Sequence, residues 1–144
     1  MKSLLLILFL FLIQFARAQY NPDKVSKKAV ALYTKALDLA RDDKFKEGIE
    51  LLKQAVNVDK NYEDAFLSMA GMYGELKDYQ DAIENYEKAK AIDSIYFKDY
   101  NLPYSINLAG KGEFEKALVA VDEFLTIPNL NETSLKAAGF RRKC

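Results

Sequence analysis

Carboxylates are the most abundant side chains in this sequence that could do chemistry, so acid–base catalysis is the first chemistry to consider. The densest acidic positions are Asp42-Asp43, Glu63-Asp64 and the pair Glu84 and Glu87. They stand at predicted turns or on helix faces that also carry lysine, which is typical of solvated surface charge. The chain has no His and one Cys, which excludes Ser-His and Cys-His pairs, the usual zinc and haem ligands and an internal disulfide. We therefore expect no enzymatic activity, no metal and no cofactor.

The composition indicates one folded domain without an electrostatic attraction for nucleic acid. In the 144 residues, 21 Lys and Arg balance 21 Asp and Glu, and 50% of the residues are hydrophobic. A nucleic-acid-binding domain normally carries a basic excess. The sequence also lacks the glycine-rich phosphate loop and the calcium-binding loop patterns. Binding of a protein or peptide segment is the class of function that remains.

Residues 1–18 have the pattern of a secretory signal peptide. Lys2 supplies a positive start, residues 4–13 are all apolar, and Ala16-Arg17-Ala18 is a cleavage signal that predicts Gln19 as the mature N-terminus. The apolar run is too short to span a bilayer, which takes about 20 residues. We therefore expect an exported, periplasmic protein with no membrane span after cleavage and with residues 19–24 as an N-terminal tail.

The main pattern in the rest of the chain is an internal repeat. A step of 34 residues takes Phe45 to Tyr79, and a step of 35 takes Tyr79 to Phe114. The same steps align apolar positions along each copy, including Ile49, Ile83 and Leu118, and also Val58, Ile92 and Ile127. Each copy has the periodicity of two short amphipathic helices, with alanines where helix backbones approach and aromatic side chains around them. The repeat therefore predicts an all-α array of helix pairs.

These residues resemble the tetratricopeptide-repeat family. The second copy carries the family's pattern at Phe66, Met69-Ala70, Tyr73, Ala82, Tyr86 and Ala89. The other copies match less fully, with Gly48 and Phe124 at positions where alanine is usual. The resemblance implies a right-handed superhelix of about three helix-turn-helix repeats over residues 25–130, at about 29–62, 63–96 and 97–131. Residues 131–144 would begin a capping or further helix, and the chain looks truncated there.

The third repeat departs from the pattern around Pro103, because proline disrupts a helix interior. Two interpretations are open. The helix starts late, with Asn101 as its cap and Pro103 in the first turn, or it starts near Phe97 and kinks. The extra residue in the 35-residue step favours the late start. The nearby Tyr100 and Tyr104 either fill an irregular join between repeats or anchor a partner, and we favour filling.

By resemblance, the first helix of each pair lines a concave groove that binds a partner segment. The implied groove residues are Tyr33, Leu37, Arg41, Asp64, Leu67, Gly71, Glu75, Asp99, Leu102 and Ile106. Co-chaperone members of the family grip a C-terminal carboxylate with Asn, Lys and Arg at such positions. Leu37, Leu67, Gly71 and Ile106 occupy several of those places here, so most of that clamp is missing.

A signal peptide followed by about three such repeats also resembles the N-terminal part of OmpA-family envelope proteins of the Bacteroidetes type. That resemblance implies a non-catalytic scaffold associated with the outer membrane, in an envelope or peptidoglycan-associated complex. The alternative is a stand-alone soluble periplasmic adaptor or chaperone-like protein. The size of the native product separates the two.

Overall fold

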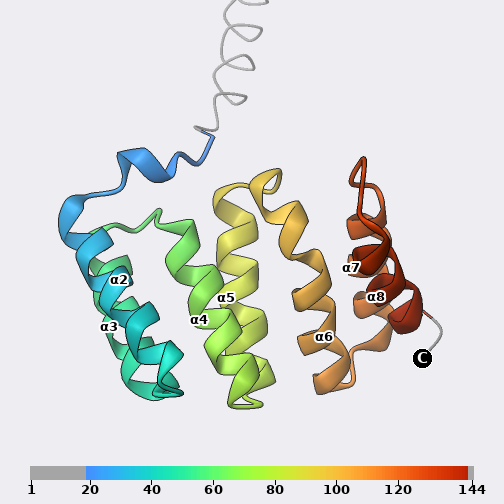
Figure 1. The fold of residues 1–144 in the computed structure, drawn as a ribbon, viewed down its shortest axis with the longest axis horizontal. Coiled ribbons are helices and arrows are strands. Elements are labelled where there is room, and N and C mark those ends of the chain that lie inside the picture. Colours follow the sequence, from blue (N-terminus) through green and yellow to red (C-terminus); the bar gives the residue numbers. More distant parts are fainter. Residues whose placement is uncertain (1–18, 143–144) are drawn as a thin grey trace, which may run out of the picture.

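The computed structural model describes residues 19–142, so the predicted signal peptide lies outside the described residues. Seven α-helices and no strands occur in this range, which confirms the all-α prediction (Figure 1). The α-helices are α2 (Lys27–Arg41), α3 (Phe45–Val58), α4 (Glu63–Glu75), α5 (Tyr79–Ile92), α6 (Asn101–Lys111), α7 (Phe114–Leu125) and α8 (Glu132–Arg142). Two short 3-10 helices, η1 (Pro22–Lys24) and η2 (Tyr96–Tyr100), precede the first and third helix pairs.

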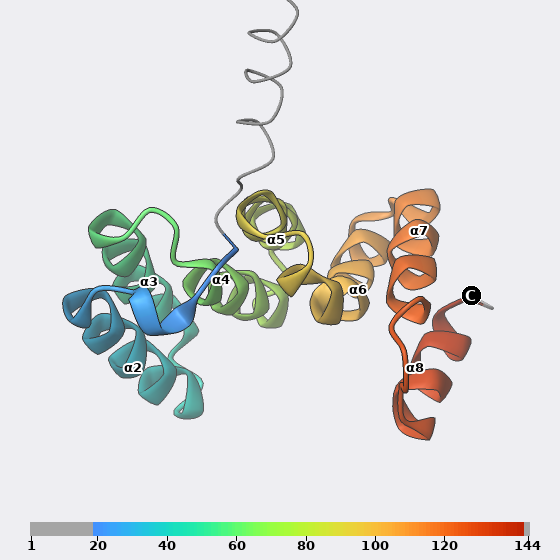
Figure 2. The same ribbon diagram turned by 90° about the horizontal axis from the view of Figure 1, so that it is seen from above.

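The helices form three antiparallel pairs, α2 with α3, α4 with α5 and α6 with α7, and α8 packs against α7. Figure 2 shows the pairs following an arc, with α2, α4, α6 and α8 along its inner side and α3, α5 and α7 along its outer side. This is the arrangement that the repeat pattern predicted. No helix among residues 19–142 is long and apolar enough to cross a membrane.

The turn inside each pair is built in the same way three times. Asp43, Lys77 and Gly112 have positive φ angles of 57°, 60° and 90°, at the 34- and 35-residue steps of the repeat. After each of them, a backbone N–H bonds back to a carbonyl five residues earlier: Lys44 to Leu39, Asp78 to Tyr73 and Glu113 to Leu108, at 2.8–2.9 Å. This is the Schellman ending of a helix, which favours glycine at the left-handed residue. Only the third turn has glycine there.

Three buried clusters hold the array together between successive helix pairs. The first joins α2, α3 and α4, the second joins α4, α5, η2, α6 and α7, and the third joins α7 to α8. Several alanines are completely buried between the helices, among them Ala36, Ala70 and Ala82. Gly48 is buried as well. A Cβ atom there would lie 3.1 Å from the carbonyl oxygen of Ala36 and 3.0 Å from the sulfur of Met72.

The join before the third pair follows the late-start interpretation. Helix α6 begins at Asn101, so Pro103 lies in its first turn, where its missing N–H costs no helical bond. The capping residue is Tyr100 rather than Asn101, and no side chain caps this end. The residues before the helix are not a loop but the 3-10 helix η2, which buries Phe97 completely.

Candidate functional site

The predicted groove residues lie on η2 and on α2, α4 and α6, the helices along the inner side of the arc, and several of them reach solvent. Tyr33 and Leu37 on α2 are half-buried, Gly71 on α4 is exposed, and Ile106 on α6 is 38% exposed. A Cβ atom at Gly71 would meet no neighbour within 4 Å, so the middle of this surface is open. We call these four residues the inner face. Arg41 and Glu75 are exposed near the C-terminal ends of α2 and α4, where Arg41 pairs with Asp38.

Three predicted groove residues are placed differently from the expectation. Leu67 is only 5% exposed and packs in the second core cluster with Phe97 and Tyr104 instead of lying on the open surface. Leu102 is half-buried and packs toward the α7–α8 cluster. Asp99 is exposed but lies in η2, before α6 begins. The inner face is therefore narrower than the family pattern implied.

Asp64 anchors a second group of residues, at the N-terminal end of α4. Its two carboxylate oxygens accept hydrogen bonds of 2.7 Å, one from the hydroxyl of Tyr20 and one from the hydroxyl of Tyr96. The rings of Tyr20 and Tyr96 meet edge to face, with their centroids 5.1 Å apart. Burial and the hydrogen bond to Asp64 raise the pKa of both tyrosines, so both hydroxyls remain donors at neutral pH.

Asp93, just after α5, binds the same N-terminal segment through the backbone. One of its oxygens accepts the N–H of Tyr20 at 2.9 Å, and the other accepts the N–H groups of Ile95 and Tyr96. Burial alone would raise the pKa of Asp93, but these backbone donors outweigh it and hold the pKa below its usual range. Asp93 is therefore a charged group that recognises backbone N–H groups.

Glu63 is the least expected member of this group. Its side chain is fully buried, and neither carboxylate oxygen has a hydrogen-bond partner. Burial, with the neighbouring charges of Asp93 and Asp64, raises its pKa to about 8. Glu63, Asp64 and Asp93, together with the half-buried Asp59 on the preceding connection, form what we call the acidic end. None of these four carboxyl groups forms an ion pair in residues 19–142.

Tyrosines connect the acidic end to the inner face. The ring of Tyr33 lies 5.1 Å from that of Tyr62, and its hydroxyl accepts a 3.3 Å hydrogen bond from Ser68. Tyr100 is half-buried, with its ring 6.2 Å from that of Tyr96. Tyr104 is only 9% exposed and lies in the second core cluster, as the filling interpretation predicted.

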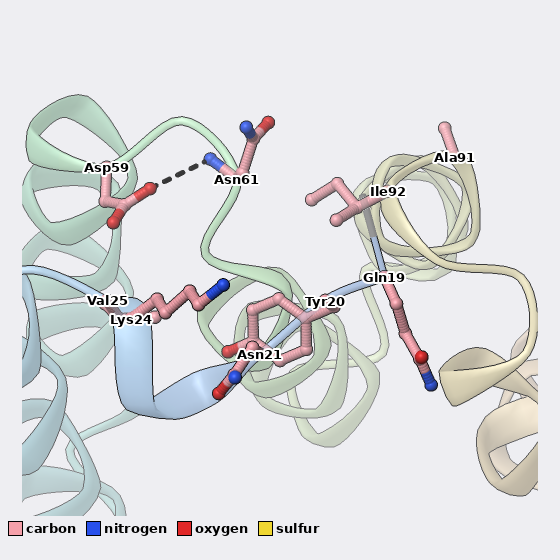
Figure 3. Close-up of a pocket in the computed structure, with 9 residues that line it drawn as sticks. All are labelled: Gln19, Tyr20, Asn21, Lys24, Val25, Asp59, Asn61, Ala91 and Ile92. Atoms are coloured by element: carbon pink, nitrogen blue, oxygen red, sulfur yellow. Dashed lines mark hydrogen bonds between the residues drawn. The ribbon is translucent and has the colours of Figure 1, made fainter. Parts of the chain in front are cut away.

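A pocket of about 600 Å³ opens beside the N-terminal segment. Figure 3 shows Tyr20 and Lys24 of that segment on one wall, with Asn61 and Ile92 of the repeats across from them. Residues 19–24 thus bridge a space between the first two helix pairs instead of packing closely over it. Within the described range, no group of three or more His, Cys, Asp or Glu side chains is arranged to hold a metal ion.

Comparison with known proteins identifies one of the three repeats by its sequence. Residues 63–96, which form α4, α5 and the start of η2, match the family model described as tetratricopeptide repeat. The chain has the tetratricopeptide-repeat fold. No curated protein matches the sequence.

Solved structures with this fold superpose on most of the chain. The first repeat domain of Spaghetti (RPAP3), bound to the HSP90 peptide SRMEEVD, has 18% identity and a TM-score of 0.74 over 82% of this chain and 95% of its own. The second repeat domain of human RPAP3, in complex with the HSP70 peptide SGPTIEEVD, has 14% identity and a TM-score of 0.73, over 81% and 97% of the chains. The translocator chaperone SycD of Yersinia enterocolitica has 20% identity and a TM-score of 0.70, over 82% and 91%. At these identities the likeness concerns the fold.

Inspection of the sequence missed Tyr20, Glu63 and Asp93 as members of a site. Tyr20 contacts residues 44 and 73 positions away, and nothing in its local sequence signals either contact. The sequence does contain two features that point to Asp93 and Glu63. Asp59 and Asp93 are equivalent in the repeat, and Glu63-Asp64 is an acidic pair at a predicted helix start.

Proposed function

We propose that this chain is a non-catalytic protein-interaction module whose inner face binds a segment of a partner protein. The observation that carries the proposal is the set of partly exposed side chains on α2 and α6, on either side of the open surface at Gly71. Tyr33 and Leu37 are half-buried and also pack on the first core cluster, and Ile106 is exposed. Accessible apolar side chains on a concave repeat surface suit the docking of an extended or helical segment. Two of the similar structures are complexes with peptides, which supports the same class of function.

The chemistry of the partner segment should differ from that in those complexes. Both of their peptides end in Glu-Glu-Val-Asp. The predicted groove residues of this chain include three acids, Asp64, Glu75 and Asp99, and one base, Arg41, which pairs with Asp38. Like charges brought together at an interface disfavour binding. We propose that the partner segment is apolar or basic rather than acidic.

We also propose that the protein acts in the bacterial envelope. The support is the signal-peptide pattern of residues 1–18, with its A-x-A cleavage site. The order of signal peptide and repeats further supports a place in a larger OmpA-like protein held at the peptidoglycan. A product much larger than 16.4 kDa in the envelope fraction, seen with an antibody against residues 25–128, is the expected result. A product somewhat smaller than that mass in the soluble periplasm would favour a free adaptor.

The test of the binding proposal introduces charge on the inner face. Leu37→Glu with Ile106→Glu should abolish capture of the partner while circular dichroism shows unchanged helicity. Lys88→Glu is a matched control, because Lys88 is an exposed residue of α5, on the outer side of the arc. Unchanged capture by the double variant would show that the partner binds elsewhere.

A further inference from the structure

We propose that the acidic end is a binding site for a partner's extended segment that presents a tyrosine and a nearby basic residue, and that residues 19–25 of this chain occupy that site as a built-in competitor. This inference rests on the proposed function and names the chemistry of one part of the partner. It adds a second contact region, at the N-terminal end of α4, to the inner face.

The contacts of Tyr20 are those of a bound peptide residue. Its backbone N–H is held at 2.9 Å by Asp93, its hydroxyl at 2.7 Å by Asp64, and its ring by an edge-to-face contact with Tyr96. The three contacts come from the second helix pair, α4 with α5, and from η2 directly after it, so the groups that hold Tyr20 all lie outside the N-terminal segment. These groups select a free backbone N–H and a phenol hydroxyl at a fixed spacing.

The segment is attached mainly at its two ends. Tyr20 is half-buried at one end, and at the other Val25 packs on the first core cluster while the N–H of Ser26 bonds to Asp59 at 3.3 Å. The residues between, 21–24, are exposed, and the pocket of about 600 Å³ lies beside them. Release of residues 19–24 therefore gives up the contacts of one residue, Tyr20, which are its two hydrogen bonds and its ring packing, and leaves the helix pairs intact.

Charge indicates what else a displacing segment carries. Four carboxyl groups gather at the acidic end without an ion pair, and Glu63 among them is fully buried with both oxygens unsatisfied. A buried polar group without a partner is unfavourable, and a cation nearby relieves the repulsion between its neighbours. The resident segment brings Lys24 to the wall of the pocket that Asp59 also lines. A partner with a basic residue a few positions from its tyrosine would place a positive charge near the same carboxyl groups.

The experiment uses a synthetic peptide with the sequence of residues 19–25, QYNPDKV, carrying a fluorophore at its C-terminus. Its binding is measured by fluorescence anisotropy to the full chain and to the Tyr20→Ala variant, in which the resident segment has lost its hydroxyl contact with Asp64 and its ring contact with Tyr96. Because the resident segment competes intramolecularly, we expect the peptide to bind Tyr20→Ala at least about tenfold more tightly than the unmodified chain. Changing the peptide's tyrosine to alanine, or adding Asp64→Asn to the protein, should remove this binding.

Equal or absent binding to the two proteins, with Tyr20→Ala folded by circular dichroism, would overturn the proposal. Hydrogen exchange on the unmodified chain gives an independent test that needs no variant. The amide of Tyr20 should exchange much faster than the amides of α4, because the segment opens without unfolding the repeats. If the amide of Tyr20 exchanged only at the rate of the α4 amides, the segment would be a fixed part of the fold, and its role as a competitor would be refuted. Neither measurement involves Leu37 or Ile106, so failure here is distinguishable from failure of the inner-face proposal.

Discussion

Replacement of Glu63 by glutamine should make the protein more stable at pH 8 and leave its stability at pH 4.5 almost unchanged. Glu63 is fully buried, lacks hydrogen-bond partners and lies near Asp93 and Asp64. Burial and these neighbours raise its pKa from 4.5 to about 8 in the folded chain. Between these two values the folded protein holds a proton that the unfolded chain has lost. Stability therefore falls as pH rises through this window, and is lowest above pH 8.

The size of the effect follows from the shift in pKa. Each unit corresponds to about 1.4 kcal/mol, so the full shift sets an upper limit of roughly 5 kcal/mol. Relaxation of the site and entry of water reduce this value, and we expect Glu63→Gln to gain about 2–4 kcal/mol over the unmodified protein at pH 8. That is a large share of the roughly 5–15 kcal/mol that stabilises a domain.

Urea denaturation at pH 4.5, 6 and 8, followed by circular dichroism, measures this directly. The chain has no His, so few other side chains titrate in the window and the background slope is small. The difference in unfolding free energy between Glu63→Gln and the unmodified protein should grow steadily with pH. A difference that stays constant from pH 4.5 to 8 would refute the assignment of a protonated, buried Glu63.

Three further predictions concern the repeats themselves. Ala82 is fully buried where helices meet, so the larger side chain of Ala82→Leu should overpack the contact. The free energy of unfolding should fall by about 1–3 kcal/mol. An unchanged free energy would contradict the close packing of helices at Ala82. Lys77 has a φ of 60°, a backbone conformation that glycine adopts without strain. Lys77→Gly should therefore stabilise the chain by about 0.5–1 kcal/mol, whereas Lys77→Ala should not. Equal urea-denaturation midpoints for the two variants would argue against the left-handed turn. Phe114 is 61% exposed on α7, so Phe114→Ser should change stability by less than about 0.5 kcal/mol. In the same urea titration, Leu108→Ala, at a fully buried site, should lower the free energy of unfolding by about 2–5 kcal/mol. Similar losses for Phe114→Ser and Leu108→Ala would contradict the difference in burial.

The fold could be predicted from the sequence because the repeat presents the same physical constraint three times. Phe45, Tyr79 and Phe114 follow the same turn, and Ala82 and Ala89 stand where backbones must approach. A single amphipathic segment is ambiguous, but three in register favour one architecture, in which alanines of every repeat, Ala55, Ala89 and Ala117, are buried.

The candidate site was less predictable because the exposure of each groove residue depends on neighbouring residues that lie outside the regular repeat pattern. Leu67 stands at a family groove position, yet it is buried with Phe97 of η2 and Tyr104 of α6, in the irregular third repeat. Tyr20 was treated as part of a tail, because its partners Asp64 and Asp93 are brought close to it only by the stacking of the helix pairs.

Site-specific photo-crosslinking at Ile106 tests the central proposal, a partner segment on the inner face, most directly. A photoreactive amino acid at Ile106 should yield one defined crosslinked partner in the producing cells, and adding Leu37→Glu should remove that product. The same probe at Lys88, on the outer side of the arc, should not give it. The same partner crosslinked equally from Lys88, or crosslinking at Ile106 unaffected by Leu37→Glu, would contradict the proposal.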